Sequence, residues 1–272
     1  MQDIDSAYMT PQEIREMREE SAHVYFESTF SFLKAHKGLR PGEMHLLLAT
    51  SGSGKSTLTR KIMMDCAEQY SVLAWLSEET RENFVSALSS NYPKKEIAEN
   101  IKIISEMGID PRYTNNPINL FNKFADHIKL LNPRVVFFDN ITTSRMYMGL
   151  RPNEQDAMAW RLKNLFEELG IACFLVAHTK SEVSDSMARL IEDTDIRGSK
   201  SISNLIPYLY IFQRFQVGSL FFPTIRIRKS RGHRIKNSLY KLTYSMDANT
   251  YVSDKALDFI DFKNAFKQRN VL

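Results

Sequence analysis

The sequence has few cysteines and glycines and no long apolar run. Two cysteines and ten glycines among 272 residues exclude a disulfide-stapled scaffold and a collagen-like chain. The longest apolar runs, at 171–177 and 205–212, are far shorter than the ~20 residues of a membrane-spanning helix. The start Met1-Gln2-Asp3 is acidic, unlike that of a signal peptide. We therefore expect a folded cytoplasmic protein without a membrane partner.

Neither the cysteines nor the net charge identifies a ligand. Cys66 and Cys173 lie in apolar stretches without the spacing of a metal site, which indicates buried free thiols. The chain has 36 Lys and Arg residues against 32 Asp and Glu, a net charge of +4. This small excess permits a nucleic-acid partner but does not require one.

Short apolar runs alternate with helical stretches through most of the chain. Most runs are apolar on both faces, which is typical of strands in a sheet that helices cover on both sides. They lie at 44–50, 71–77, 101–104, 134–139, 171–177 and 208–213. Helical patterns separate them at 55–68, 80–90, 119–131 and 154–169. This order predicts an α/β fold with a mostly parallel sheet.

The N-terminal region differs from the rest of the chain. From Thr10-Pro11 to His36, a helix-start signal and a mixed-charge face predict one long, partly amphipathic helix. We therefore divide the chain into an N-terminal arm at 1–36 and a larger α/β domain at 37–272.

The pattern changes again after Gln213. Period-two alternation at 220–229 and 238–244 predicts an antiparallel pair at the sheet edge, joined through Arg231-Gly232-His233. A last helix is predicted at 255–267.

A phosphate-binding loop directly follows the first expected strand. The segment Ala49-Thr50-Ser51-Gly52-Ser53-Gly54-Lys55-Ser56-Thr57 matches the P-loop pattern GxxxxGK[ST], except that Ala replaces its first Gly. Its glycines let backbone N–H groups turn inward around phosphates, and the following helix adds positive potential. Lys55 would reach the β and γ oxygens, and Ser56 would hold Mg²⁺. We expect ATP or another nucleoside triphosphate, bound by Ser51, Gly52, Ser53, Gly54, Lys55, Ser56 and Thr57.

Three other expected strands end in groups that a nucleotide hydrolase needs. Asp139 ends an apolar strand, where such enzymes place the carboxylate that helps to hold Mg²⁺. Glu78 is our first choice, and Glu79 our second, for the carboxylate that positions or deprotonates the attacking water. Both acids could instead simply open the next helix. His178 ends a further strand and is either a sensor of the phosphates or an ordinary core or surface histidine.

Two basic clusters lie further along the chain. One is the segment 195–200, and the other comprises Arg226, Arg228, Lys229 and Arg231. Cations on an edge strand often only block pairing with another sheet. The alternative is a finger that reaches the γ-phosphate bound to a neighbouring subunit.

The order of these motifs resembles that of the RecA-like hexameric helicases of the DnaB, phage primase-helicase and Twinkle type. The resemblance extends over residues 38–252 and includes the lead-in Gly38-Leu39-Arg40-Pro41-Gly42-Glu43 before a P-loop that begins with Ala. His178-Thr179-Lys180 is similar to the His-x-Lys of the phage enzymes, and 195–199 is similar to their D-[LI]-R-G-S segment. Glu78-Glu79-Thr80 also looks like the KaiC ATPases, so the subfamily stays open.

The resemblance implies roles for individual residues. Glu78 would be the catalytic glutamate, and His178 would couple the γ-phosphate to a DNA-binding loop. Arg214 looks like the arginine that closes the next strand and is a further candidate for nucleotide binding. Lys229-Ser230-Arg231 is similar to the Lys-x-Arg pair that those helicases insert into the adjacent active site, with Arg231 as the finger and Lys229 as its companion.

The same resemblance implies that two loops, at 142–153 and 180–197, line a central channel. Their cations would follow the phosphates of single-stranded DNA. The residues concerned are Arg145, Arg151, Lys180 and Arg197.

The implied function is an oligomeric, ATP-dependent DNA helicase or translocase. It would form a homo-oligomer, expected to be a hexameric ring, with ATP and Mg²⁺ as cofactors and single-stranded DNA in its channel. It would act in the cytoplasm of a cell or of a phage host. The arm at 1–36 would either dock on the neighbouring subunit, like the linker helix of that family, or pack on its own chain. A primase or loader would be a separate protein. The alternatives are a filament-forming recombination or strand-annealing ATPase of the RecA type, or a KaiC-like regulatory ATPase.

Overall fold

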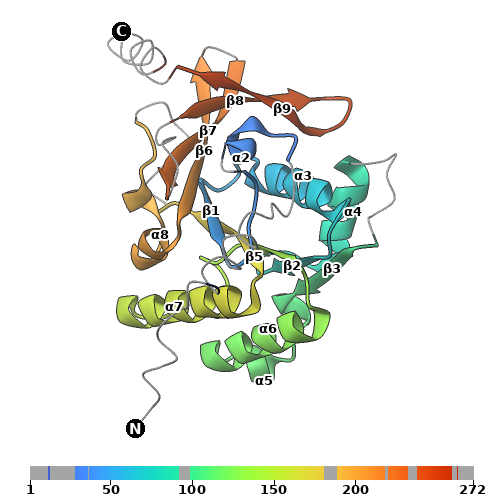
Figure 1. The fold of residues 1–272 in the computed structure, drawn as a ribbon, viewed down its shortest axis with the longest axis vertical. Coiled ribbons are helices and arrows are strands. Elements are labelled where there is room, and N and C mark those ends of the chain that lie inside the picture. The colour runs from blue at the N-terminus through green and yellow to red at the C-terminus, as the bar shows by residue number, and fades with distance from the viewer. Residues whose placement is uncertain are drawn as a thin grey trace.

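A nine-stranded sheet runs through the described part of the molecule (Figure 1). The computed structural model describes residues 12, 28–35, 37–91, 99–180, 189–217, 220–231, 238–258 and 262. Parallel pairing joins β1 (Met44–Ala49), β2 (Val72–Leu76), β3 (Ile101–Ser105), β4 (Val135–Asp139), β5 (Ala172–His178) and β6 (Tyr208–Val217). Antiparallel pairing then adds β7 (Leu220–Ser230), β8 (Leu239–Ser245) and β9 (Thr250–Leu257). The strand order is β3-β2-β4-β5-β1-β6-β7-β8-β9, which confirms the predicted mixture of a parallel sheet and an antiparallel edge.

Helices cover both faces of this sheet (Figure 1). The four predicted helices of the α/β region are present as α3 (Lys55–Ala67), α4 (Arg81–Asn91), α6 (Pro117–Leu131) and α7 (Pro152–Leu169). Shorter elements complete the described part: α2 (Ser31–Lys34), α5 (Pro111–Thr114), α8 (Ser201–Leu205) and the 3₁₀ turns η2 (Glu106–Gly108) and η3 (Asp193–Asp195).

The central strand β1 packs on both faces. Leu47 lies in one buried apolar cluster together with Ile62 of α3. Leu46 lies in the cluster of the opposite face, together with Phe124 of α6 and Leu162 of α7. Successive side chains of a strand point to opposite faces, so a strand between two helical layers must be apolar throughout.

Two helices begin earlier than their apolar pattern predicts, because local capping sets their first residue. Asn116 Oδ1 accepts hydrogen bonds from the N–H groups of Ile118 (2.9 Å) and Asn119 (3.1 Å), so α6 begins at Pro117 rather than at 119. At α7, Glu154 accepts a hydrogen bond from Arg151 N at 2.8 Å. In both helices proline occupies the first turn, where its missing N–H costs nothing.

The C-terminal prediction is wrong at residues 255–257. Strand β9 extends to Leu257, through the start of the helix predicted at 255–267. Residues 250–257 pair with residues 239–245 of β8 in antiparallel register, so the backbone bonds of that ladder replace helical ones. Phe262 is helical, as predicted, and its N–H donates to the Asp258 carbonyl oxygen at 3.0 Å. The remaining residues of the predicted helix after Asp258 lie outside the described part of the chain.

The N-terminal prediction of one continuous helix is wrong at residues 28–30, which are not helical. Gln12 and the short α2 at Ser31–Lys34 are helical, as predicted. Ser28 Oγ accepts a hydrogen bond from Phe30 N at 3.0 Å, a side-chain contact that competes with helix formation. The other residues up to 27, except Gln12, and His36 lie outside the described part of the chain.

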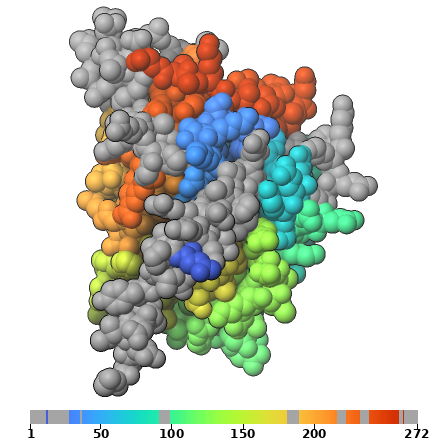
Figure 2. Space-filling view, viewed as in Figure 1, coloured from blue at the N-terminus to red at the C-terminus, as the bar shows by residue number. Residues whose placement is uncertain are grey.

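The end of the expected arm packs against the α/β domain. Phe30 and Phe32 are fully buried in the same apolar cluster as β1. Figures 1 and 2 show α2 beside β9, where Asp254 accepts hydrogen bonds from the N–H groups of Ser31 (2.7 Å) and Phe32 (2.9 Å). Docking of the remaining arm on a neighbouring subunit stays a prediction.

Two expectations from composition can be compared with the structure. Cys66 and Cys173 are buried and free, as predicted, and burial raises the pKa of both thiols. None of the helices in the described ranges combines the length and apolarity that crossing a bilayer requires.

Candidate nucleotide-binding site

The predicted phosphate loop leaves the middle of the sheet at the end of β1. Ala49 pairs with His178 of β5 on one side and with Phe212 of β6 on the other. Gly52 and Gly54 have φ angles of 71° and 95°, in the left-handed region that favours glycine. The loop therefore turns at the carboxyl ends of the parallel strands, where α/β folds bind ligands.

The residues of this loop surround the start of α3. Ser53 is buried, and its Oγ donates to the Thr50 carbonyl oxygen at 2.8 Å, which closes the turn. Lys55, the first residue of α3, is only 6% exposed. Gly54 precedes it and has no side chain to cap the helix, so the first N–H groups of α3 can bind an anion. Exposure is high at Ser51 and Gly52 and intermediate at Ser56 and Thr57.

Tyr251 of β9 lies over the phosphate loop. A Cβ atom added at Gly54 would lie 3.0 Å from the Tyr251 hydroxyl oxygen. The ring of Tyr251 is buried against Phe212, the residue of β6 that pairs with the end of β1, with ring centroids 5.9 Å apart. Sequence reasoning missed this residue, because it placed no strand at 250–257.

We predict that Gly54→Ala destabilises the protein more than Gly52→Ala. Both alanines would hold a left-handed backbone at a cost of about 1–2 kcal/mol. Among the described residues, the added Cβ at position 52 meets no atom within 4 Å, whereas the one at position 54 lies 3.0 Å from the Tyr251 hydroxyl oxygen, closer than ordinary van der Waals contact. Thermal unfolding of the two variants measures the difference. Adding Tyr251→Phe to Gly54→Ala should recover part of the loss, since it removes the contacting oxygen. Equal destabilisation by the two glycine substitutions would contradict this geometry.

Asp139 has the surroundings of a metal ligand. It ends β4, is 8% exposed, and its Oδ1 is buried without a hydrogen-bond partner among the described residues. Burial raises the pKa of Asp139, while Lys55 and a hydrogen bond from Ser56 lower it. A buried carboxylate oxygen without a partner beside the Ser56 hydroxyl is a donor set that suits Mg²⁺, so Asp139 and Ser56 fit the predicted metal role.

Glu78 and His178 form a direct contact at the same end of the sheet. Glu78 Oε1 lies 2.9 Å from His178 Nε2. The His178 hydrogen bond lowers the pKa of Glu78 to about 2, with smaller contributions from Asn140 and Lys55. Glu78 is therefore a carboxylate at neutral pH. The sequence placed both groups at strand ends, and the structure brings them together.

Glu79 has a different environment. Arg60 of α3 donates hydrogen bonds to its two carboxylate oxygens at 2.7 and 3.0 Å. Burial raises the pKa of Glu79, and Arg60 opposes this effect. The geometry thus favours Glu78 over Glu79 as the residue that faces the nucleotide, because Glu79 is held by an ion pair that the sequence pattern did not indicate.

The two predicted finger residues lie at the opposite end of the sheet. Through the pairing of β6 with β1 and β7, Ser230 lies level with His45, four residues or ~13 Å before Ala49 along β1. Lys229 Nζ donates to the carbonyl oxygens of Ser203 (2.9 Å) and Asn204 (2.7 Å) in α8. Arg231 is exposed, and its guanidinium donates to the Asn204 oxygen at 3.3 Å.

Arg214 lies at the phosphate-loop end instead. It follows Phe212 by two residues on β6, and Phe212 pairs with the last residue of β1. Arg214 is half-buried there. A contact between Arg214 and a nucleotide bound at the loop stays a prediction.

Arg226 and Arg228 do not block a sheet edge. Strand β7 pairs with β6 on one side and with β8 on the other, so it is an interior strand. Arg226 is buried and donates to Glu192 Oε1 at 3.2 and 3.1 Å, while Arg228 donates to Glu192 Oε2 at 2.8 Å. These ion pairs tie the segment after β5 to β7. Sequence reasoning missed this role because Glu192 lies more than 30 residues away.

The predicted DNA-binding cations occupy two settings. Lys180 and Arg197 are exposed and lie on two paired segments, since Lys180 N donates to the Asp195 oxygen (2.8 Å) and Arg197 N to the His178 oxygen (2.9 Å). Residues 181–188 between them lie outside the described part of the chain. Arg145 is exposed but donates from its guanidinium to Thr114 Oγ1 at 2.9 Å, and the exposed Arg151 precedes α7.

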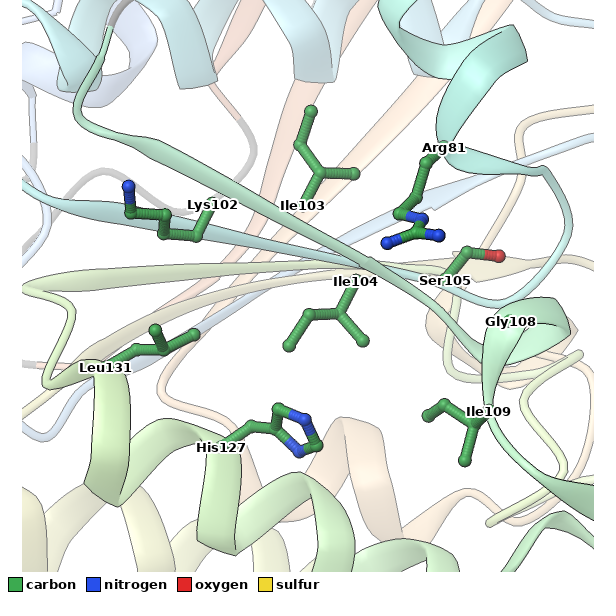
Figure 3. Close-up of a pocket in the computed structure, with 9 residues that line it drawn as sticks. All are labelled: Arg81, Lys102, Ile103, Ile104, Ser105, Gly108, Ile109, His127 and Leu131. Carbon is green, nitrogen blue, oxygen red and sulfur yellow. The ribbon is translucent and has the colours of Figure 1, made fainter.

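A pocket of about 370 Å³ opens elsewhere, beside β3 (Figure 3). It is lined by Arg81, Lys102, Ile103, Ile104, Ser105, Gly108, Ile109, His127 and Leu131. Three strands separate β3 from β1, and the predicted site residues do not line this pocket. Its position thus excludes it as the site of the phosphate loop.

The fold can be compared with known proteins. No protein-family model matches the chain. Among solved structures, the chain is similar to the KaiC-like protein from the hyperthermophilic archaeon Pyrococcus horikoshii OT3, with a TM-score of 0.61 and 16% sequence identity. The match covers 82% of this chain and 92% of that protein. The chain therefore has a RecA-like α/β fold, which it shares with this KaiC-like protein.

Proposed function

We propose that this protein is an oligomeric Mg²⁺-dependent ATPase that moves along single-stranded DNA. The proposal rests on one geometric observation. One end of the sheet gathers the phosphate loop, Asp139, Glu78 and His178, while Lys229 and Arg231 lie at the other end. A site divided in this way is complete only when a neighbouring subunit supplies the second half.

The phosphate-loop half has the groups for binding and hydrolysis. Lys55 and the first N–H groups of α3 would bind the β- and γ-phosphates. Mg²⁺, when bound by Ser56 and Asp139, would neutralise charge on the phosphate oxygens. Glu78 would orient the attacking water and accept its proton. His178, which contacts Glu78 at 2.9 Å, would sense the γ-phosphate.

The other half supports assembly. Arg231 is exposed, and Lys229 is partly buried beside α8. Neither lies within reach of the phosphate loop of its own chain, given the separation along β1. Both would therefore act on the nucleotide of the next subunit, with Arg231 stabilising charge in the transition state. This arrangement requires a head-to-tail assembly, and we propose that it closes into a ring. Electron microscopy distinguishes a closed ring from an open filament.

The DNA-binding part of the proposal is supported by the segment after β5. The backbone oxygen of His178 accepts a hydrogen bond from Arg197, and Lys180 lies two residues after His178. A shift of His178 on binding the γ-phosphate would thus move both cations. Phosphate contacts by exposed Lys and Arg make DNA binding depend on salt.

A single experiment tests assembly and ligand together. We expect ATPase activity per subunit to rise with protein concentration, and single-stranded DNA to increase it further at low salt. Lys55→Ala should abolish activity in both conditions and serves as the control for contaminating ATPases. Activity that is independent of concentration would exclude the shared site.

A KaiC-like regulatory ATPase is the second candidate. The KaiC-like protein from P. horikoshii matches over 92% of its length, and Glu78-Glu79-Thr80 also looks like the KaiC ATPases. In that case activity would still depend on concentration, but single-stranded DNA would leave it unchanged at every salt concentration. The same experiment therefore separates the two candidates.

A further inference from the structure

Asn140, which directly follows Asp139, has an amide whose orientation is fixed. Its side chain has no exposed surface. Asn140 Oδ1 accepts hydrogen bonds from Thr142 Oγ1 (2.9 Å), Thr143 N (3.0 Å) and Thr143 Oγ1 (2.8 Å). A backbone N–H can only donate, so this end of the amide must be the oxygen. The NH₂ group consequently points away from both threonines.

The NH₂ group of Asn140 is buried and has no hydrogen-bond partner among the described residues. Buried polar groups are nearly always hydrogen-bonded, so a donor of this kind requires an explanation. The neighbouring anion is the Glu78 carboxylate, whose pKa is lowered by Asn140 as well as by His178. The donor therefore lies near the proposed catalytic carboxylate, since the Asn140 backbone bonds to Ser77, the residue directly before Glu78.

The surroundings of Asn140 connect three strand ends. Asn140 N donates to Ser77 Oγ at 2.9 Å, and Ser77 Oγ donates to the Asn140 oxygen at 2.7 Å. Ser77 immediately precedes Glu78. On the other side, His178 N donates to Thr142 Oγ1 at 3.0 Å. Hydrogen bonds thus join the carboxyl ends of β2, β4 and β5 around Asn140.

We propose that Asn140 is a positioning residue for Glu78. In the structure, Glu78 contacts His178. When His178 turns to the γ-phosphate, Glu78 loses this partner, and Asn140 Nδ2 then donates to its carboxylate and keeps it directed at the attacking water. The role rests on the proposed ATPase function. Thr142 and Thr143 hold the amide in the orientation that makes this possible.

Asn140→Asp tests the role with the smallest change of shape. Aspartate can still accept the three hydrogen bonds from Thr142 and Thr143, but it places an oxygen in the position of the NH₂ group that lies near Glu78. We expect kcat to fall about 10²-fold, the scale of a small misplacement of a reacting group, with the KM for ATP unchanged. Asn116→Asp makes the same atomic change at the start of α6, where aspartate caps equally well, and should leave kcat unchanged.

A binding measurement separates positioning from a structural effect. ADP with aluminium fluoride mimics the transition state. We expect Asn140→Asp to bind this mimic more weakly than the wild type does, and to bind ADP alone with unchanged affinity. Thr143→Val should lower kcat in the same way, because it removes a donor to Asn140 Oδ1. Thr143→Ser keeps the hydroxyl group and should therefore keep kcat near the wild-type value.

Three results would overturn the role. One is an unchanged kcat in Asn140→Asp. Another is a parallel loss of kcat, ADP affinity and melting temperature in Asn140→Asp and Thr143→Val, which would show that Asn140 only maintains the fold. A wild-type protein that neither hydrolyses ATP nor binds ADP would contradict the proposed function itself, and this role with it.

Discussion

Glu78→Gln is expected to lower kcat for ATP hydrolysis by about 10²–10⁴-fold, the usual contribution of a positioned acid–base group. Glu78 Oε1 lies 2.9 Å from His178 Nε2, and glutamine can keep this contact because its shape is nearly the same. The substitution therefore removes the charge and the capacity to accept a proton, and leaves the site otherwise in place. Steady-state kinetics and ATP binding, measured on one preparation, separate the loss of chemistry from the loss of binding.

Glu79→Gln is the matched control for this prediction. The two residues are adjacent, but Glu79 is paired with Arg60. We expect Glu79→Gln to change stability more than kcat, because it weakens an ion pair between α3 and the end of β2. A large loss of kcat in Glu79→Gln with full activity in Glu78→Gln would reverse the assignment.

The lowered pKa of Glu78 also has a consequence for pH dependence. Its pKa in the folded protein is about 2, below the ordinary glutamate value, because His178 donates to the carboxylate. The stabilisation by this contact is thus fully present above the ordinary value and is lost as the pH falls toward 2. Any acid limb of the kcat profile near neutral pH must come from another group.

Arg231→Ala is expected to lower kcat of the assembled protein by about 10³–10⁵-fold, the usual contribution of an arginine finger. In a single subunit Arg231 makes one described side-chain hydrogen bond, to the Asn204 oxygen, and is exposed. Its removal should therefore leave folding and assembly unchanged. Arg112→Ala is a suitable control, because Arg112 is also exposed and bonds only locally to Asp110 among its described contacts.

Mixing two inactive variants tests whether the finger acts between subunits. Lys55→Ala disables a phosphate loop but keeps the finger, whereas Arg231→Ala keeps the loop but lacks the finger. In mixed oligomers, some sites combine an intact loop with an intact finger, so activity should reappear. Activity that stays absent in demonstrably mixed oligomers, or wild-type activity of Arg231→Ala, would exclude this role.

Local patterns in the sequence were sufficient for the parts of the site that depend on neighbouring residues. The phosphate loop requires glycines, Lys55 and a following helix within a few residues, so its position is visible without a structure. The ends of β4 and β5 are equally visible in the sequence. A strand covered on both faces is a continuous apolar run, so the first polar residue marks its end. Two segments differ from their prediction: residues 28–30 interrupt the predicted helix, and residues 250–257 form a strand that was not predicted. Their sequence patterns are weak, and contacts with distant parts of the chain decide their structure.

The sequence alone thus determined the α/β fold and which groups stand at the ends of its parallel strands, because both follow from the period and length of apolar segments. Only the tertiary structure decided which of these groups meet. It paired Glu78 with His178 and Glu79 with Arg60, and it placed Arg231 at the end of the sheet away from the phosphate loop. These outcomes depend on strand order and register, and residues that lie 19 to 100 positions apart in the chain carry no local signal of their contact.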